Sequence, residues 1–129
     1  MKIYVTKKKK LPGTDYREVH AHARKLYREI ERKTKRRPYI RSAYFHKEKI
    51  FLDYFWSHIW QKNWRDRVRR LKYYPCALDL LMHSRFEPST KENPNRRSEL
   101  LHRFAGMTTD RELFFVQVSE RKETGEKVW

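Results

Sequence analysis

Hydrophobic side chains recur at helical spacing near the N-terminus. The positions i, i+4, i+7 and i+11 are all apolar and form one stripe of a helix: Val19, Ala23, Leu26 and Ile30. Thr14 and Asp15 offer an N-cap, so the pattern predicts a helix from there to about Lys33. Residues 1–13 contain four consecutive lysines followed by Leu-Pro-Gly, and we expect a mobile basic arm that ends in a turn.

The middle of the chain mixes strand and helix patterns. A proline ends any continuation of the first helix, and residues 39–45 are typical of a short strand. Residues 49–52 fit either a strand or the start of a helix. The apolar spacing then predicts three further helices: 53–62, 64–74 and 75–84.

The C-terminal part predicts a β-hairpin. Residues 85–99 carry two prolines, two asparagines and several charges, and are expected to form a long loop. Residues 100–106 and 112–119 then flank a turn as the two strands of a hairpin. Another strand begins near Lys127, which suggests a natural chain that continues beyond Trp129.

These elements predict an α+β fold, in which N-terminal and central helices pack on a small antiparallel β-sheet with a C-terminal hairpin. A chain of 129 residues can bury one modest core, so residues 14–129 are expected to form a single domain behind the arm. Side chains alternate between the two faces of a strand. Phe114, Val116 and Val118 are therefore expected in the core, and Gln117 on the open face.

Charge identifies the class of partner. The chain has 32 Lys and Arg against 16 Asp and Glu, a net charge of +16, and 15% of its residues are aromatic. A basic surface attracts phosphate backbones by counterion release, and aromatic rings can stack on unpaired bases. We therefore expect nucleic acid as the partner, RNA rather than DNA. The alternative is a solvated basic surface that keeps the protein soluble or steers an acidic protein.

Two basic clusters are the candidates for nucleic-acid binding. They lie before the predicted strand at 39–45 and along the helix at 64–74, and they comprise Lys35, Arg36, Arg37, Arg65, Arg69, Arg70 and Lys72. On the helix, the alternative interpretation is a solvated face with Asp66 as a partial counter-charge, and the sequence favours neither.

Several functional classes are disfavoured by what the sequence lacks. With only three glycines it has no glycine-rich phosphate loop, and a single cysteine, Cys76, allows no intramolecular disulfide and no thiolate metal cluster. His20 and His22 would point to different sides of a helix, and the other four histidines lack carboxylate or cysteine partners at metal-ligand spacing. Neither a metal nor a cofactor is therefore expected. No apolar run is long enough to span a membrane, and we expect a cytoplasmic protein without membrane partners.

A metal-free ribonuclease remains compatible with the sequence, because RNA carries its own nucleophile. His102 and Arg103 on the first hairpin strand are the leading catalytic candidates. As neighbours they face opposite sides: Arg103 is expected on the open face with Gln117, and His102 with Phe104 on the other. The alternative makes His102 a hydrogen-bonded structural histidine and Arg103 an ordinary surface residue.

Arg41 and His58 are further candidates. Arg41 on the predicted strand could clamp a phosphate, although a solvated strand arginine is the commoner case. His58 lies between Trp and Ile neighbours, which favours a core or interface histidine over a general base.

A family resemblance supports this hypothesis. Its motifs are Arg-Pro-Tyr-Ile-Arg-Ser at 37–42, Lys-Ile-Phe-Leu-Asp-Tyr-Phe-Trp at 49–56, Arg-Arg-Leu-Lys-Tyr-Tyr-Pro-Cys-Ala at 69–77, and the hairpin from Leu-His-Arg-Phe-Ala-Gly at 101–106 to Phe-Val-Gln-Val at 115–118. With these motifs the chain resembles a set of small bacterial and mobile-element proteins. That set in turn resembles the phage-associated branch of the barnase, EndoU, colicin E5/D and RelE-like nuclease fold.

The resemblance implies a metal-independent ribonuclease with helices that precede a small antiparallel sheet. It points to polar residues on the open face, here Arg41, Arg103 and Gln117, and such proteins are often toxins, which would imply an acidic antitoxin. Relatives continue through another strand. We therefore expect an RNA-binding, metal-independent, toxin-like endoribonuclease. The alternatives are a non-catalytic nucleic-acid-binding module of a phage or mobile element, and a structural protein with an acidic partner.

Overall fold

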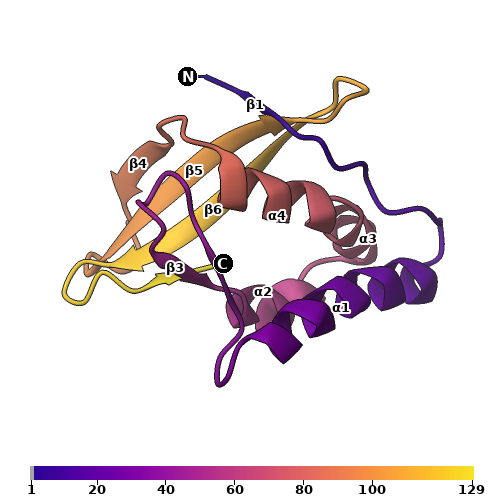
Figure 1. Ribbon diagram of the computed structural model, residues 1–129, viewed down its shortest axis with the longest axis horizontal. Helices are drawn as coiled ribbons and strands as arrows, with labels where there is room; N and C mark the ends of the chain where they lie inside the picture. The colour runs from indigo at the N-terminus through magenta and orange to yellow at the C-terminus, as the bar shows by residue number, and fades with distance from the viewer. Residues whose placement is uncertain (1) are drawn as a thin grey trace.

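The computed structural model describes residues 2–129 and has an α+β fold, as predicted (Figure 1). Its elements follow in the order β1 (Tyr4–Val5), α1 (Tyr16–Lys33), β2 (Tyr39–Arg41), β3 (Lys49–Phe51), α2 (Asp53–His58), the 3₁₀ turn η1 (Ile59–Gln61), α3 (Trp64–Lys72), α4 (Tyr74–His83), β4 (Ser89–Glu92), β5 (Glu99–Met107), β6 (Leu113–Arg121) and β7 (Lys127–Val128). The predicted helices are all present. Of residues 49–52, which fitted either a strand or a helix start, 49–51 form the strand β3.

The hairpin of β5 and β6 is the centre of a seven-stranded sheet. The strands lie in the order β1-β5-β6-β7-β3-β2, and β4 pairs with β5 on the same edge as β1. The sheet is mixed rather than purely antiparallel, because β1 runs parallel to β5 and β3 runs parallel to β7. In Figure 1, β5 and β6 run diagonally as the longest strands, and the helices gather below and to the right of them.

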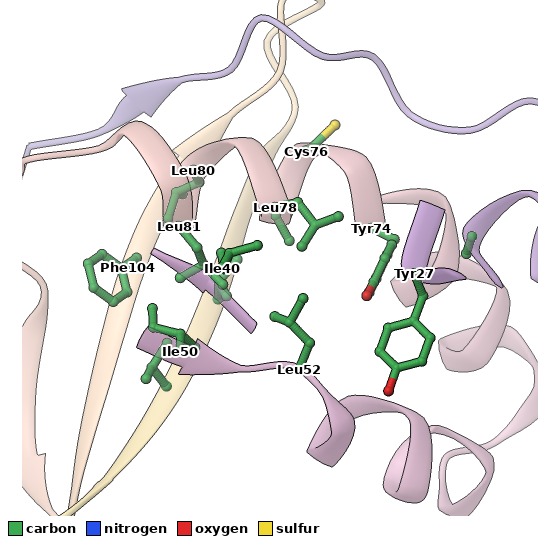
Figure 2. Packing of buried hydrophobic residues seen from close by; sticks show 14 of the residues in the cluster. Tyr27, Ile40, Ile50, Leu52, Tyr74, Cys76, Leu78, Leu80, Leu81 and Phe104 are labelled. Atoms are coloured by element: carbon green, nitrogen blue, oxygen red, sulfur yellow. The ribbon is translucent and has the colours of Figure 1, made fainter. Parts of the chain in front are cut away.

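One face of the sheet forms the core together with the helices. Helix α4 contacts β5 and β2, and α1 contacts β2, α3 and α4. The buried side chains come from alternate strand positions, including Phe114, Val116 and Val118 as predicted. Helix α4 contributes others, among them Tyr74, Leu78 and Leu81 (Figure 2). In α1, Val19 and Ala23 of the predicted stripe are fully buried. The other face of the β5–β6 hairpin is left exposed, with Arg103, Phe115 and Gln117 at its surface.

Two predicted segments differ in the structure. The strand expected over 39–45 ends at Arg41, because the chain then turns through Ser42–Glu48 with His46 and Lys47 in the left-handed region at φ 55° and 67°. The loop expected over 85–99 contains β4, whose residues Ser89–Glu92 pair with β5. All four residues of β4 are exposed and polar or charged, so the segment has no alternating pattern that could predict a strand.

The N-terminal arm is docked on the fold rather than mobile. β1 pairs with the end of β5, and the Lys7 backbone N–H and the Tyr4 hydroxyl both donate to the Asp79 carboxylate on α4. The Cys76 thiol is buried beneath the arm and donates to the Lys8 carbonyl oxygen, and burial raises its pKa. Among residues 2–129, no helix has the length and apolar character needed to cross a membrane.

Candidate functional site

A groove of about 710 Å³ lies on the exposed face of the sheet, and we call it the open-face groove. It is bounded by β4, β5, β6, β7, helix α2 and the turn between β4 and β5. Its lining residues are Arg37, Tyr54, His58, Lys91, Asn93, Pro94, Asn95, Arg96, Glu99, Leu101, Gln117, Ser119, Arg121, Glu126 and Val128.

Strand register explains how the floor of the groove is built. Lys91 pairs with Leu101, Leu101 with Ser119, and Ser119 with Val128, so these four side chains form one row across β4, β5, β6 and β7. Directly paired residues point to the same face of a sheet. Gln117 and Arg121 lie two positions to either side of Ser119 on β6 and share its face.

Helix α2 supplies one wall of the groove through Tyr54 and His58. Their rings stack with centroids 3.9 Å apart and an interplanar angle of 19°. The Nδ1 atom of His58 lies 2.9 Å from the Tyr54 carbonyl oxygen. Because a carbonyl oxygen only accepts hydrogen bonds, Nδ1 carries the proton in the neutral ring, and Nε2 is left with a lone pair that can accept another.

Arg37 ties this wall to the C-terminal turn. Its Nε donates to the Asp53 carboxylate at the start of α2 at 2.9 Å, and its Nη1 lies 3.4 Å from Glu126. The guanidinium also lies 4.2 Å from the Phe51 ring centroid. The hydrogen bond to Asp53 raises the pKa of Arg37. Arg37 therefore holds the Glu126 carboxylate beside the first turn of α2.

The charge of the groove is predominantly positive. Four of its lining side chains are cations, Arg37, Lys91, Arg96 and Arg121, and two are anions, Glu99 and Glu126. Both carboxylates are partnered by arginine, since Arg96 Nη1 lies 3.7 Å from Glu99. Lys91 and Arg121 are exposed. The groove thus presents cations for a phosphodiester together with an imidazole and carboxylates that can move protons.

Three residues predicted from the sequence line the groove: Arg37, His58 and Gln117. His58 is half-buried at the surface rather than enclosed in the core. Arg103 pairs with Gln117 on the same face, as predicted, and its guanidinium lies 4.0 Å from the Phe115 ring centroid. Arg41 shares this face by its register with Lys49, but it belongs to the edge strand β2 and does not line the groove.

His102 faces the opposite side of the sheet, so it cannot act in a common cleft with Arg103. It is 6% exposed, its Nε2 lies 2.7 Å from Glu120 Oε1, and its Nδ1 lies 2.8 Å from the Thr90 hydroxyl. Its ring also packs on Phe45 with centroids 5.0 Å apart. The geometry agrees with the alternative that His102 is a structural histidine with both ring nitrogens bonded.

The Glu120 carboxylate that holds His102 also belongs to an ionic cluster around the buried Lys127. Glu120 lies 3.9 Å from the ammonium of Lys127, which is 5% exposed and donates to Glu48 at 2.7 Å and to the Gly125 carbonyl at 2.9 Å. Each buried polar atom of such a cluster needs a hydrogen-bonding or ionic partner. In the described part of the chain no buried side-chain nitrogen or oxygen lacks one.

The remaining predicted nucleic-acid contacts lie outside the groove. Lys35 and Arg36 are exposed on the connection between α1 and β2. The other four are on α3, three of them exposed and Lys72 half-buried: Arg65, Arg69, Arg70 and Lys72. They form a second basic surface, separate from the groove.

The sequence reasoning missed several groove residues. Ser119 and Arg121 follow Gln117 at the strand period of two, so their shared face was readable from the sequence. Lys91 belongs to a segment without a strand pattern. Tyr54 and Glu126 reach the site only through the placement of α2 and of the final turn.

Within residues 2–129, no three His, Cys, Asp or Glu side chains are grouped so that they could hold a metal ion. Comparison with known proteins finds no match: no family model matches the chain, and no curated protein and no solved structure is significantly similar to it.

Proposed function

We propose that this protein binds RNA in the open-face groove and cleaves its backbone without a metal ion. The observation that carries the proposal is the convergence of His58, Glu126 and the exposed cations Lys91 and Arg121 on one groove of a strongly basic chain. RNA is favoured over DNA because its 2′-hydroxyl supplies the nucleophile, so the protein needs only proton transfer and charge neutralisation.

The groove offers the groups that this reaction requires. The 2′-oxygen attacks the adjacent phosphorus, the P–O5′ bond breaks, and the products are a 2′,3′-cyclic phosphate and a free 5′-hydroxyl. One group takes the proton from the 2′-hydroxyl, and another gives a proton to O5′. We assign the first role to the Glu126 carboxylate and the second to His58 in its protonated form.

The cations have a separate role in the proposed reaction. Lys91 and Arg121 would offset the negative charge that develops on the phosphate oxygens. Arg37 positions Glu126 through their 3.4 Å contact. Gln117 and Ser119 on the floor offer hydrogen bonds to the sugar or base.

Two further observations bear on where the protein acts and on a protein partner. The buried, reduced thiol of Cys76 supports a cytoplasmic location. On the same face, from Phe115 beside Gln117 toward the far end of the hairpin, the apolar side chains of Phe115, Leu113 and Val5 are exposed. Such a surface beside a basic groove favours an inhibitor protein with acidic and apolar residues, as a toxin-like nuclease would need.

The test incubates the purified protein with labelled single-stranded RNA in excess EDTA and resolves the products on a gel. We expect cleavage with cyclic-phosphate ends, reduced at least about 100-fold by His58→Ala and by Glu126→Gln. His22→Ala is the matched control, because His22 is exposed on α1 and does not line the groove.

A substrate with a single 2′-deoxynucleotide at the cleaved position separates this mechanism from others, since it has no nucleophile there and should resist cleavage. RNA binding without cleavage by the parent protein would instead establish the non-catalytic nucleic-acid-binding module. Cleavage that persists in both groove variants would refute the assignment of His58 and Glu126.

A further inference from the structure

We infer that Trp60 and Trp64 form a stacking platform for unpaired bases, which makes single-stranded RNA the preferred ligand over duplex. The inference rests on the proposed RNA binding but uses a surface outside the groove. Trp60 is 62% exposed and Trp64 is 59% exposed. Indole rings are rarely left so open, because burying them is strongly favourable.

Each of the two tryptophans is held in place by a local contact. The Trp60 Nε1–H donates to the Ser57 carbonyl oxygen at 3.0 Å. The Trp64 ring packs at a tilt on Tyr16 of α1, with centroids 4.6 Å apart. One side of the Trp64 ring is thus supported while much of its surface stays open to solvent.

The turn between the two tryptophans is braced by hydrogen bonds. Arg67 donates to the carbonyl oxygens of Trp60 and Lys62. Asn63 caps α3 by accepting from the Asp66 backbone N–H at 2.9 Å. A platform that is ordered before binding loses little entropy when a base stacks on it.

The local charge selects nucleic acid as the occupant. Residues 60–72 contain six Lys or Arg and one Asp, a net charge of +5, and Arg65, Arg69 and Arg70 are exposed. Exposed rings among cations match the alternation of bases and phosphates along a single strand. Along the chain, Trp60 comes two residues after His58 of the groove wall.

The experiment measures binding of a 2′-O-methyl oligonucleotide, which cannot be cleaved, so the result does not depend on catalysis. Fluorescence anisotropy compares a labelled single strand with a blunt duplex of the same length at low salt. We expect Trp60→Ala and Trp64→Ala each to weaken single-strand binding by about 5-fold or more, and duplex binding by less than twofold. Trp60→Phe and Trp64→Phe should restore most of the lost affinity.

Phe86→Ala is the control, because Phe86 is an exposed aromatic ring, at 38%, in the segment between α4 and β4, outside the groove and the basic helix α3. Single-strand affinity that is unchanged in both alanine variants would overturn the platform while leaving the groove proposal intact. An equal loss for single strand and duplex would also overturn it, since stacking requires unpaired bases. A parent protein that binds neither oligonucleotide would overturn the platform and the proposed RNA binding together.

Discussion

Arg103 on β5 and Gln117 on β6 lie directly opposite each other on the exposed face of the sheet. One residue away, His102 pairs with Val118 on the buried face. The pleat of one strand therefore separates two adjacent polar residues into different environments. Arg103 stands beside the groove, whereas His102 is part of the internal hydrogen-bond network.

This separation predicts that substitutions of two neighbouring residues destabilise the fold to different extents. His102→Ala should lower the free energy of unfolding by about 2 kcal/mol or more, because it leaves a cavity and removes the partner of the half-buried Glu120. Arg103→Ala should lower it by less than about 1 kcal/mol, since only an exposed contact with Phe115 is lost. Urea denaturation measures both.

RNA cleavage by the His102→Ala protein, assayed well below its unfolding midpoint, should stay within a few-fold of the parent. A folded His102→Ala protein that has lost all cleavage would contradict the structural role of this residue and return it to the catalytic candidates.

Gly106 on β5 lies close to both Phe114 of β6 and Leu80 of α4. A Cβ atom at this position would clash with Phe114 Cζ and would lie 2.7 Å from Leu80 Cδ1. Gly106→Ala should therefore destabilise the protein by about 1–3 kcal/mol through overpacking. Gly125→Ala cannot serve as the control, because Gly125 has φ 75°, where an alanine is itself strained. Ala105→Gly is used instead, because it makes the reverse exchange of glycine and alanine at the neighbouring position of β5. A thermal melt of Gly106→Ala that overlays the parent would contradict the close packing.

Glu112 predicts an acid-dependent loss of stability. Hydrogen bonds from Lys10 and then from Tyr73 lower the pKa of this carboxyl below its ordinary value of 4.5. A carboxyl with a lowered folded-state pKa stabilises the fold fully above its unfolded pKa, and this contribution is lost as pH falls through the folded pKa. The melting temperature of the parent should therefore fall more steeply below pH 4.5 than that of Glu112→Gln.

Tyr73→Phe separates the two donors to Glu112, because it keeps the ring that packs on Phe114 and removes only the hydroxyl. Its acid-dependent loss should be intermediate between those of the parent and Glu112→Gln. At high pH, Tyr73 predicts a loss of stability as the pH rises, the opposite direction to that of Glu112. Burial and the Glu112 hydrogen bond raise its pKa to about 12, so its stabilising contribution is lost as pH rises from about 10 through about 12. Identical pH profiles of all three proteins would show that this contact is not formed.

The salt dependence of RNA binding reports the phosphate contacts of the groove. The logarithm of the RNA-binding constant falls linearly with the logarithm of the salt concentration. Lys91→Ala and Arg121→Ala should each make this slope shallower by about 0.7, the value for one phosphate contact with a single strand. Lys25→Ala is the control, because Lys25 is exposed on α1 and does not line the groove. Slopes unchanged in both groove variants would place the phosphates elsewhere.

The sequence by itself determined the elements whose patterns are local. The periodicity of α1, the hairpin, and the alternation that buries Val116 and Val118 while exposing Gln117 were all readable, because the side chains on either side of a helix or strand follow from its geometry. The same alternation placed Arg103 with Gln117 and set His102 apart from both. Net charge likewise follows from composition alone.

Only the tertiary structure decided which distant segments meet. β4 has no apolar pattern, and it is a strand because β5 offers an unpaired edge to which Lys91 is then fixed. β1 docks parallel to β5 from a sequence separation of about one hundred residues. Arg37, His58 and Glu126 come together because β3 and β7 pair in parallel and bring α2 beside the last turn. Such pairings depend on complementary surfaces of the folded chain, which no local propensity encodes.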